Sequence, residues 1–155
     1  KDIEDGCIVI LGGDFNEPSH LDWTRETKDL FDHHGMIIPW TVTLLLDNNG
    51  FIDSYREKYP DVLKYPGFTF PSDNSLVEVD KLTLAKKADE RDRIDYIFYY
   101  PDKRLKLVDA SVFGPNKSIV RSERVIESTS DKFVLPLGVW PTDHKGLIVT
   151  FELND

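Results

Sequence analysis

One stretch near the start of the chain constrains the fold more than any other. The apolar residues 8–11 are followed by two glycines, and Asp14 and Asn16 come soon after them. The run is β-branched and too short for a helix buried on all sides, so it predicts a buried strand. Asp14 could then serve a cation or a water at the end of a core strand, and Asn16 could donate to a phosphate oxygen. Because Gly, Asp and Asn are also ordinary turn residues, this stretch alone leaves a plain Asx turn equally open.

Length and composition indicate a single globular domain. The chain has 155 residues, of which 40% are hydrophobic, and this is enough for a sizeable core. No apolar run approaches the roughly 20 residues of a membrane span, so none is expected. The formal net charge of −9 argues against extended binding to duplex DNA, because basic side chains hold that polyanion. A small phosphorylated substrate held by metal ions stays compatible with this charge.

Sequence patterns predict a mixture of helices and strands after the opening strand. Ser19 and Asp22 suit the start of a helix over about residues 23–34, and a second helix is expected over about residues 42–49. Alternating apolar residues between turn signals predict further strands. These strands are expected at residues 66–73, 94–100, 105–113 and 147–151.

The segment 66–73 leaves two interpretations open. Phe68 and Phe70 share one face, which is either packed inside an edge strand or part of a wall that faces substrate. In the second case Thr69 or Phe70 would contact the substrate. The charged residues 76–93 predict a long loop, and its lysines and arginines would be either a solvated surface or a guide for an anionic substrate.

Two further stretches place charged residues beside core strands. A carboxylate at Asp95, inside an apolar strand, is costly unless it is paired, so we expect a partner, for which a histidine would be suitable. Asp143 and His144 lie in a loop directly before the last strand, which would hold both side chains on a firm base. A lone histidine beside an aspartate is usually a polar surface pair without a function. Because this chain has three strand ends that carry an acidic residue, a surface pair is a less satisfactory explanation here.

Three motifs together resemble the endonuclease/exonuclease/phosphatase superfamily, whose members have the deoxyribonuclease I-like fold. They follow one another along the chain in the order of that family, and residues 12–23 and 67–71 also resemble its bacterial members. The motifs are Gly13-Asp14-Phe15-Asn16, Arg93-Ile94-Asp95-Tyr96-Ile97 and Thr142-Asp143-His144. The family position of Thr142 is commonly serine, and threonine keeps the hydroxyl.

The resemblance implies an α+β fold, namely the C-terminal part of a four-layer α/β sandwich with a mixed sheet and flanking helices. It covers nearly the whole chain but only the C-terminal portion of the family's domain. Residues 1–155 are therefore expected to be one domain, a fragment of the family's catalytic domain. The opposite wall of the site is expected to lie before Lys1.

The resemblance also implies a role for each matching residue. His144 corresponds to the catalytic histidine next to the phosphate, and Asp95 to the acidic partner that fixes its orientation and tautomer. Asp14 corresponds to the carboxylate that orients or deprotonates the attacking water. Asn16 corresponds to the amide that holds a phosphate oxygen. Asp143, together with Asp14, corresponds to a divalent metal site.

The implied activity is Mg²⁺- or Mn²⁺-dependent hydrolysis of a phosphoester by in-line attack of water. A phosphodiesterase, a nuclease and a phosphatase all fit, and either Asp14 or His144 could take the proton. A non-catalytic interaction domain that keeps the fold is the alternative. Because half of the site would be missing, the fragment itself is expected to be inactive or nearly so. One sheet face would be uncovered, so we expect either self-association through that face or a chain that proteolysis has cut down.

Overall fold

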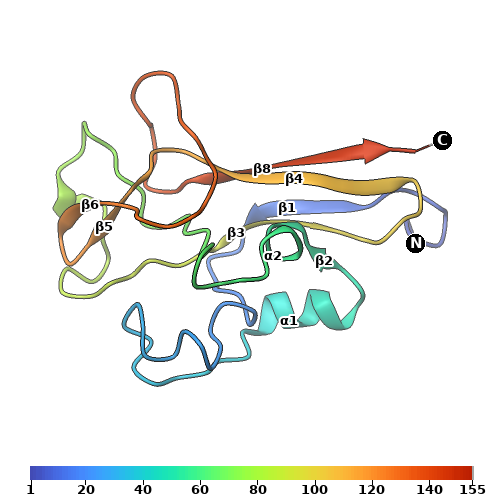
Figure 1. Ribbon diagram of the computed structural model, residues 1–155, viewed down its shortest axis with the longest axis horizontal. Helices are drawn as coiled ribbons and strands as arrows, with labels where there is room; N and C mark the ends of the chain where they lie inside the picture. Colours follow the sequence, from blue (N-terminus) through green and yellow to red (C-terminus); the bar gives the residue numbers. More distant parts are fainter. Residues whose placement is uncertain (155) are drawn as a thin grey trace.

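Strands dominate the computed structural model, which describes residues 1–154 and has a mixed α and β content (Figure 1). This agrees with the expected α+β class at a coarse level. None of the helices in residues 1–154 combines the length and the apolar character that crossing a membrane requires. In chain order the elements are β1 (Ile10–Asp14), α1 (Thr41–Asn48), β2 (Ile52–Asp53), α2 (Ser54–Lys58), η1 (Val79–Lys81), β3 (Asp95–Tyr99), β4 (Leu105–Phe113), β5 (Lys117–Val120), β6 (Glu123–Ile126), β7 (Phe133–Val134) and β8 (Gly146–Leu153).

The strands form two three-stranded sheets and one hairpin. The first sheet has the order β1-β3-β2 and is antiparallel, and the second has the order β7-β4-β8. The second sheet is mixed, because β4 pairs parallel with β7 and antiparallel with β8. β5 and β6 pair with each other. Figure 1 shows β4 and β8 running along one side of the molecule with β1 and β3 beside them.

The short helix α2 contacts both of the larger sheets, through β3 and β4. Its start is fixed by Asp53, whose Oδ1 accepts the backbone N–H groups of Tyr55 and Arg56 at 3.1 Å. Tyr55 is fully buried in a core cluster with Ala110 and Val112. Its hydroxyl donates to Asp131 Oδ1 at 2.5 Å, so the polar end of the ring is satisfied inside the core.

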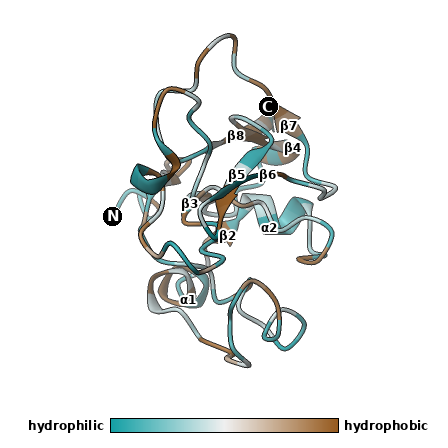
Figure 2. Ribbon diagram, turned by 90° about the vertical axis from the view of Figure 1, so that its left-hand side faces the viewer, coloured by the Kyte–Doolittle hydropathy of each residue, from teal (hydrophilic) through white to brown (hydrophobic). Residues whose placement is uncertain are grey.

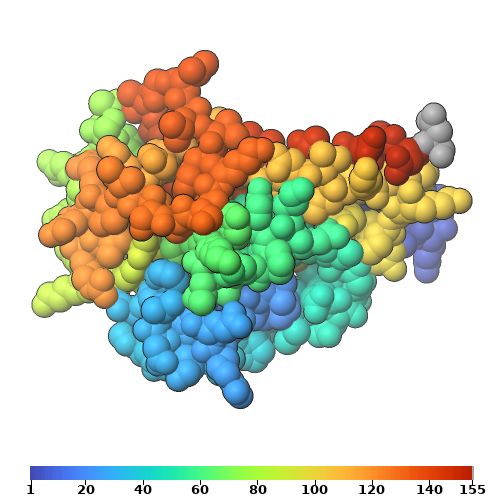
Figure 3. Space-filling model, viewed as in Figure 1, coloured from blue at the N-terminus to red at the C-terminus, as the bar shows by residue number. Residues whose placement is uncertain are grey.

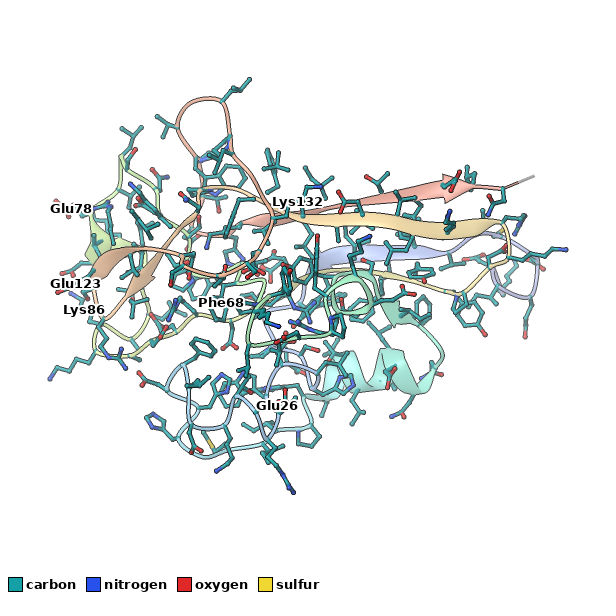
Figure 4. All side chains as sticks on the ribbon, viewed as in Figure 1. Glu26, Phe68, Glu78, Lys86, Glu123 and Lys132 are labelled. Atoms are coloured by element: carbon teal, nitrogen blue, oxygen red, sulfur yellow. The ribbon has the colours of Figure 1, made fainter. Side chains whose placement is uncertain are left out.

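A buried network of charged side chains joins α2 to Arg93, which lies two residues before β3. The guanidinium of Arg93 lies 2.9 Å from Asp22 and 2.6 Å from Asp53, and Arg56 lies 2.8 Å from Asp22. Buried charges need such partners. The arginine at the end of the basic run 76–93 therefore holds the interior together and is not available to guide a substrate. Lys86, from the same run, pairs with Asp80 at 2.6 Å and lies at the end of the molecule that carries β5 and β6 (Figure 4).

Two predicted elements are wrong, and both were displaced by long-range contacts. Residues 23–34 form turns and no helix, because Asp22 binds the buried arginines and Trp23 Nε1 donates to Asp92 at 2.8 Å. These residues form a lobe beside the strands, coloured blue in Figure 3. Residues 66–73 make only isolated bridges, from Phe70 to Asp92 and from Ser72 to Ser118. The second predicted helix is confirmed as α1.

The strand β1 is present as predicted, but it is exposed and not buried. All five of its residues are exposed, with Ile10 at 49% and Leu11 at 38%. Within residues 1–154, β3 is the strand that pairs with β1. Figure 2 shows that hydrophobic stretches, coloured brown, occur in loops as well as in strands. Apolar surface is thus left uncovered on this part of the molecule.

Candidate active site

Asp14, Asp95 and His144 form the centre of the candidate site. Asp14 ends β1 and Asp95 begins β3, and the two are paired directly across the antiparallel ladder. Directly opposite residues point to the same face, so two carboxylates lie side by side and repel each other. His144 Nδ1 lies 3.1 Å from Asp95 Oδ2 and 3.9 Å from Asp14 Oδ2. The three side chains can bring one ligand atom each within 4.8 Å of one another.

Hydrogen bonds connect the loop that carries His144 to residues 66–73. Lys145 N donates to Thr69 O at 2.6 Å, and Ser72 N donates to Asp143 O at 2.6 Å. Trp140 Nε1 donates to the carbonyl oxygen of His144, also at 2.6 Å. These bonds fix the backbone on both sides of His144, so its imidazole is presented from a firm support although it comes from a loop.

Asp95 is partly buried, and burial raises the pKa of its carboxyl group. Hydrogen bonds with Thr69 and His144 act in the opposite direction and favour the ionised form. When Nδ1 of His144 carries its proton, it donates to Asp95 and leaves Nε2 with a lone pair. Asp95 was expected to need a partner, for which a histidine would be suitable, and the structure places His144 Nδ1 at this position.

A hollow of about 560 Å³ adjoins the cluster, a size typical of small-molecule sites. His144, Asn16, Asp143 and Phe70 all line it. The ring of Phe70 lies 5.0 Å from the imidazole of His144. Asn16 adopts a positive φ of 49°, and its N–H donates to Asp14 Oδ1 at 2.8 Å. The Asx turn is therefore real, and it also directs Asn16 to the hollow.

A second, smaller hollow of about 320 Å³ borders Asp14 and Asp95. Gly13 and Gly146 are part of its wall. A Cβ atom added at either glycine would meet nothing within 4 Å, so packing alone does not require glycine there. Because glycine has no side chain, the carboxylates of Asp14 and Asp95 stay accessible from this hollow.

The structure thus brings most of the predicted site residues together, with two exceptions. Thr69 is fully buried and does not line the hollow, because its Oγ1 accepts the backbone N–H groups of Ile94 at 3.0 Å and Asp95 at 3.2 Å. It therefore positions β3 and cannot touch a substrate in this structure. Asp143 lines the hollow but lies outside the three-residue cluster, and its Oδ1 accepts a hydrogen bond from Thr142 at 3.2 Å.

Sequence reasoning missed Asp92 and Trp23, which line the hollow together. Asp92 Oδ1 accepts the hydrogen bond from Trp23 Nε1 at 2.8 Å, and burial raises the pKa of this aspartate to about 7. Asp92 stands between two arginines in the sequence, a pattern that normally indicates a solvated run of charges. Its backbone pairing with Phe70 could not be read from that pattern.

Comparison with known proteins adds one relative. No family model matches the chain, and neither does any solved structure. A segment of 91 residues, 59% of the chain, is 40% identical to the uncharacterized protein F14F9.5 of Caenorhabditis elegans. That segment covers 27% of the relative, so the match spans about a quarter of its length. The name of the relative assigns no activity.

Proposed function

We propose that this chain carries part of the active site of a metal-dependent phosphoester hydrolase, which would be a phosphodiesterase, a nuclease or a phosphatase. The observation that carries the proposal is the pairing of Asp14 with Asp95 beside His144, next to a hollow of small-molecule size. A purely structural sheet end gains nothing from two opposed carboxylates. We further propose that the two larger sheets are the C-terminal part of a four-layer α/β sandwich of the deoxyribonuclease I-like kind.

The donor set fits a hard divalent cation. Carboxylate oxygens are the ligands that Mg²⁺ and Mn²⁺ prefer, and a cation would offset the repulsion between Asp14 and Asp95. Asp14, whose side chain is 39% exposed, and Asp143 in the adjoining hollow are the residues that would hold it. When bound, Mg²⁺ or Mn²⁺ would neutralise charge on the phosphate and polarise the phosphorus.

The side chains around the cluster would each have a separate role in catalysis. Asp95 would hold the imidazole of His144 in one orientation and one tautomer through the 3.1 Å contact. Asn16 would donate its amide to a phosphate oxygen in the hollow. Asp14 would orient the attacking water, and the proton would go to Asp14 or to His144 Nε2. The water would attack in line with the departing oxygen.

Hydrolysis assays on the full-length protein test this proposal. The substrates are p-nitrophenyl phosphate, bis-p-nitrophenyl phosphate and a short single-stranded oligonucleotide, each with Mg²⁺ or Mn²⁺. His144→Ala should lower the rate by about 10²–10⁴-fold, as expected for loss of a general acid or base. His20→Ala is the matched control, because His20 contacts Thr43 Oγ1 of α1 at 2.9 Å and lies outside the cluster. Equal rates for His144→Ala and wild type would refute the proposal.

The second candidate, a non-catalytic interaction domain, is favoured by the exposed apolar residues Ile10 and Leu11 of β1. The two functions differ in a simple measurement. A divalent cation should raise the melting temperature of a catalytic protein, and Asp14→Asn should abolish the increase. A melting temperature that is indifferent to Mg²⁺ and Mn²⁺, without hydrolysis of any substrate, would favour the interaction domain.

A further inference from the structure

The hollow beside His144 combines aromatic walls with negative charge. Trp23 and Phe70 contribute aromatic rings, and Glu90, Asp92 and Asp143 contribute carboxylates. Phe31 also lines the hollow, but the guanidinium of Arg91 already lies 5.3 Å from the centre of its ring. Within residues 1–154 no lysine or arginine lines this hollow. The charge of its wall is therefore unsuited to a second phosphate or a nucleic acid strand.

Three of the carboxylates in the wall have no cationic partner among the described residues. Asp32 and Asp89 also line the hollow, but they pair with Arg121 and Arg91, each at 2.7 Å. The unpaired carboxylates belong to Glu90, Asp92 and Asp143. Glu90 accepts hydrogen bonds from Thr83, Leu84 and Ala85, and Asp143 from Thr142.

Asp92 is the most exceptional of the three. Its Oδ1 accepts the hydrogen bond from Trp23 Nε1, and its Oδ2 makes none within the described part of the chain. Burial makes the ionised form costly, which is why the pKa of Asp92 is raised to about 7. A positive charge placed in the hollow would offset that cost directly.

The backbone brings the aromatic rings and this carboxylate together. Asp92 N donates to Phe70 O at 3.0 Å, and Phe70 N donates to Asp92 O at 3.1 Å, so the two residues are paired directly. Their side chains consequently point to the same face. Trp23 Nε1 donates to the carboxylate of Asp92. The ring of Phe70 also lies 5.0 Å from the imidazole ring of His144. The hollow is continuous with the candidate catalytic residues.

We propose that this hollow binds the positively charged nitrogen of an amino-alcohol phosphoester. This inference rests on the proposed function, because it places the phosphate at His144 and the ammonium group among Trp23, Phe70 and Asp92. Aromatic faces attract ammonium groups, and the attraction grows when a carboxylate is nearby and water is partly excluded. The volume of about 560 Å³ accommodates a small alcohol of this kind.

Calorimetric titration of the full-length protein tests the proposal without any need for hydrolysis. The probes are choline, phosphocholine, glycerol 3-phosphate and adenosine monophosphate. Choline should bind, and phosphocholine should bind about tenfold or more tighter than glycerol 3-phosphate. Asp92→Asn keeps an acceptor for Trp23 and should weaken phosphocholine binding about tenfold, while Phe70→Tyr keeps an aromatic face and should retain it.

The controls separate this inference from the proposed function. Asp47→Asn, on the exposed side of α1, should bind phosphocholine as wild type does. His144→Ala should lose hydrolysis but keep choline binding, so the ammonium site can exist even if the catalytic assignment fails. Absence of choline binding, equal affinity for phosphocholine and glycerol 3-phosphate, or tightest binding of adenosine monophosphate would each overturn the proposal.

Discussion

Asp14 and Asp95 lie directly opposite each other at the ends of β1 and β3, so two carboxylates share one face of the sheet. Neither has an arginine or lysine within ion-pairing distance among the described residues, and His144 is the group that approaches both. Such an arrangement is unfavourable for folding alone. It becomes useful when the charges act on a cation, a proton or a water.

Replacing Asp14 by Asn should stabilise the protein and impair its activity. Removing one of two opposed charges should raise the free energy of unfolding by about 0.2–1 kcal/mol, while Asn keeps an acceptor for the N–H of Asn16. Urea denaturation in metal-free buffer and the hydrolysis assay measure the two effects. Asp47→Asn should change neither. A loss of stability in Asp14→Asn would indicate that Asp14 serves the fold and not the chemistry.

Replacing Thr69 by Val should destabilise the protein, because Thr69 is fully buried. Its Oγ1 accepts two backbone N–H groups of the segment entering β3, and valine would leave both donors unsatisfied. We expect a loss of about 1–3 kcal/mol in the free energy of unfolding. Thr69→Ser keeps the hydroxyl and should lose less. If Thr69→Val unfolded at the wild-type denaturant concentration, these two hydrogen bonds would contribute nothing to stability.

The raised pKa of Asp92, about 7, predicts a pH dependence of stability. A raised pKa favours the protonated form in the folded state, so this contribution is full below the ordinary aspartate pKa and is lost as the pH rises through about 7. Asn resembles the protonated acid. Asp92→Asn should therefore gain about 1–3 kcal/mol over wild type at about pH 8, and little at about pH 4. Denaturation curves at both pH values give the comparison, and a constant difference would contradict the assignment.

The exposed strand β1 predicts self-association of the isolated 155-residue chain. Ile10 and Leu11 are exposed, and one edge of β1 has no strand partner within residues 1–154. Free edges and apolar surface promote pairing between copies. Light scattering should show a mass above 17.9 kDa that increases with concentration, and Leu11→Lys should reduce it. A strict monomer at all concentrations would count against this prediction.

Local pattern was enough to find several elements of the fold, among them the strand that carries Asp95. The strand around Asp95 and the helix α1 follow from apolar periodicity, and the need of Asp95 for a partner follows from the cost of placing a carboxylate in an apolar strand. The identity of that partner followed only from the resemblance of the motifs. The hydrogen bond of Asn16 N to Asp14 was also visible in advance as an Asx turn.

The sequence by itself determined the helix α1 and the strands that correspond to β3, β4 and β8, because apolar periodicity depends on neighbours along the chain. Only the tertiary structure decided what each residue faces. Asp22 and Trp23 suited a helix, but both contact residues far along the chain instead. Asp22 pairs with the buried arginines, and Trp23 donates a hydrogen bond to Asp92. Thr69 belonged to a strand-like pattern, but it is buried in the structure, where its hydroxyl accepts backbone N–H groups at the start of β3. The exposure of β1 and the hollow between Phe70, Asp92 and His144 arise from packing between distant segments, which local propensity does not encode.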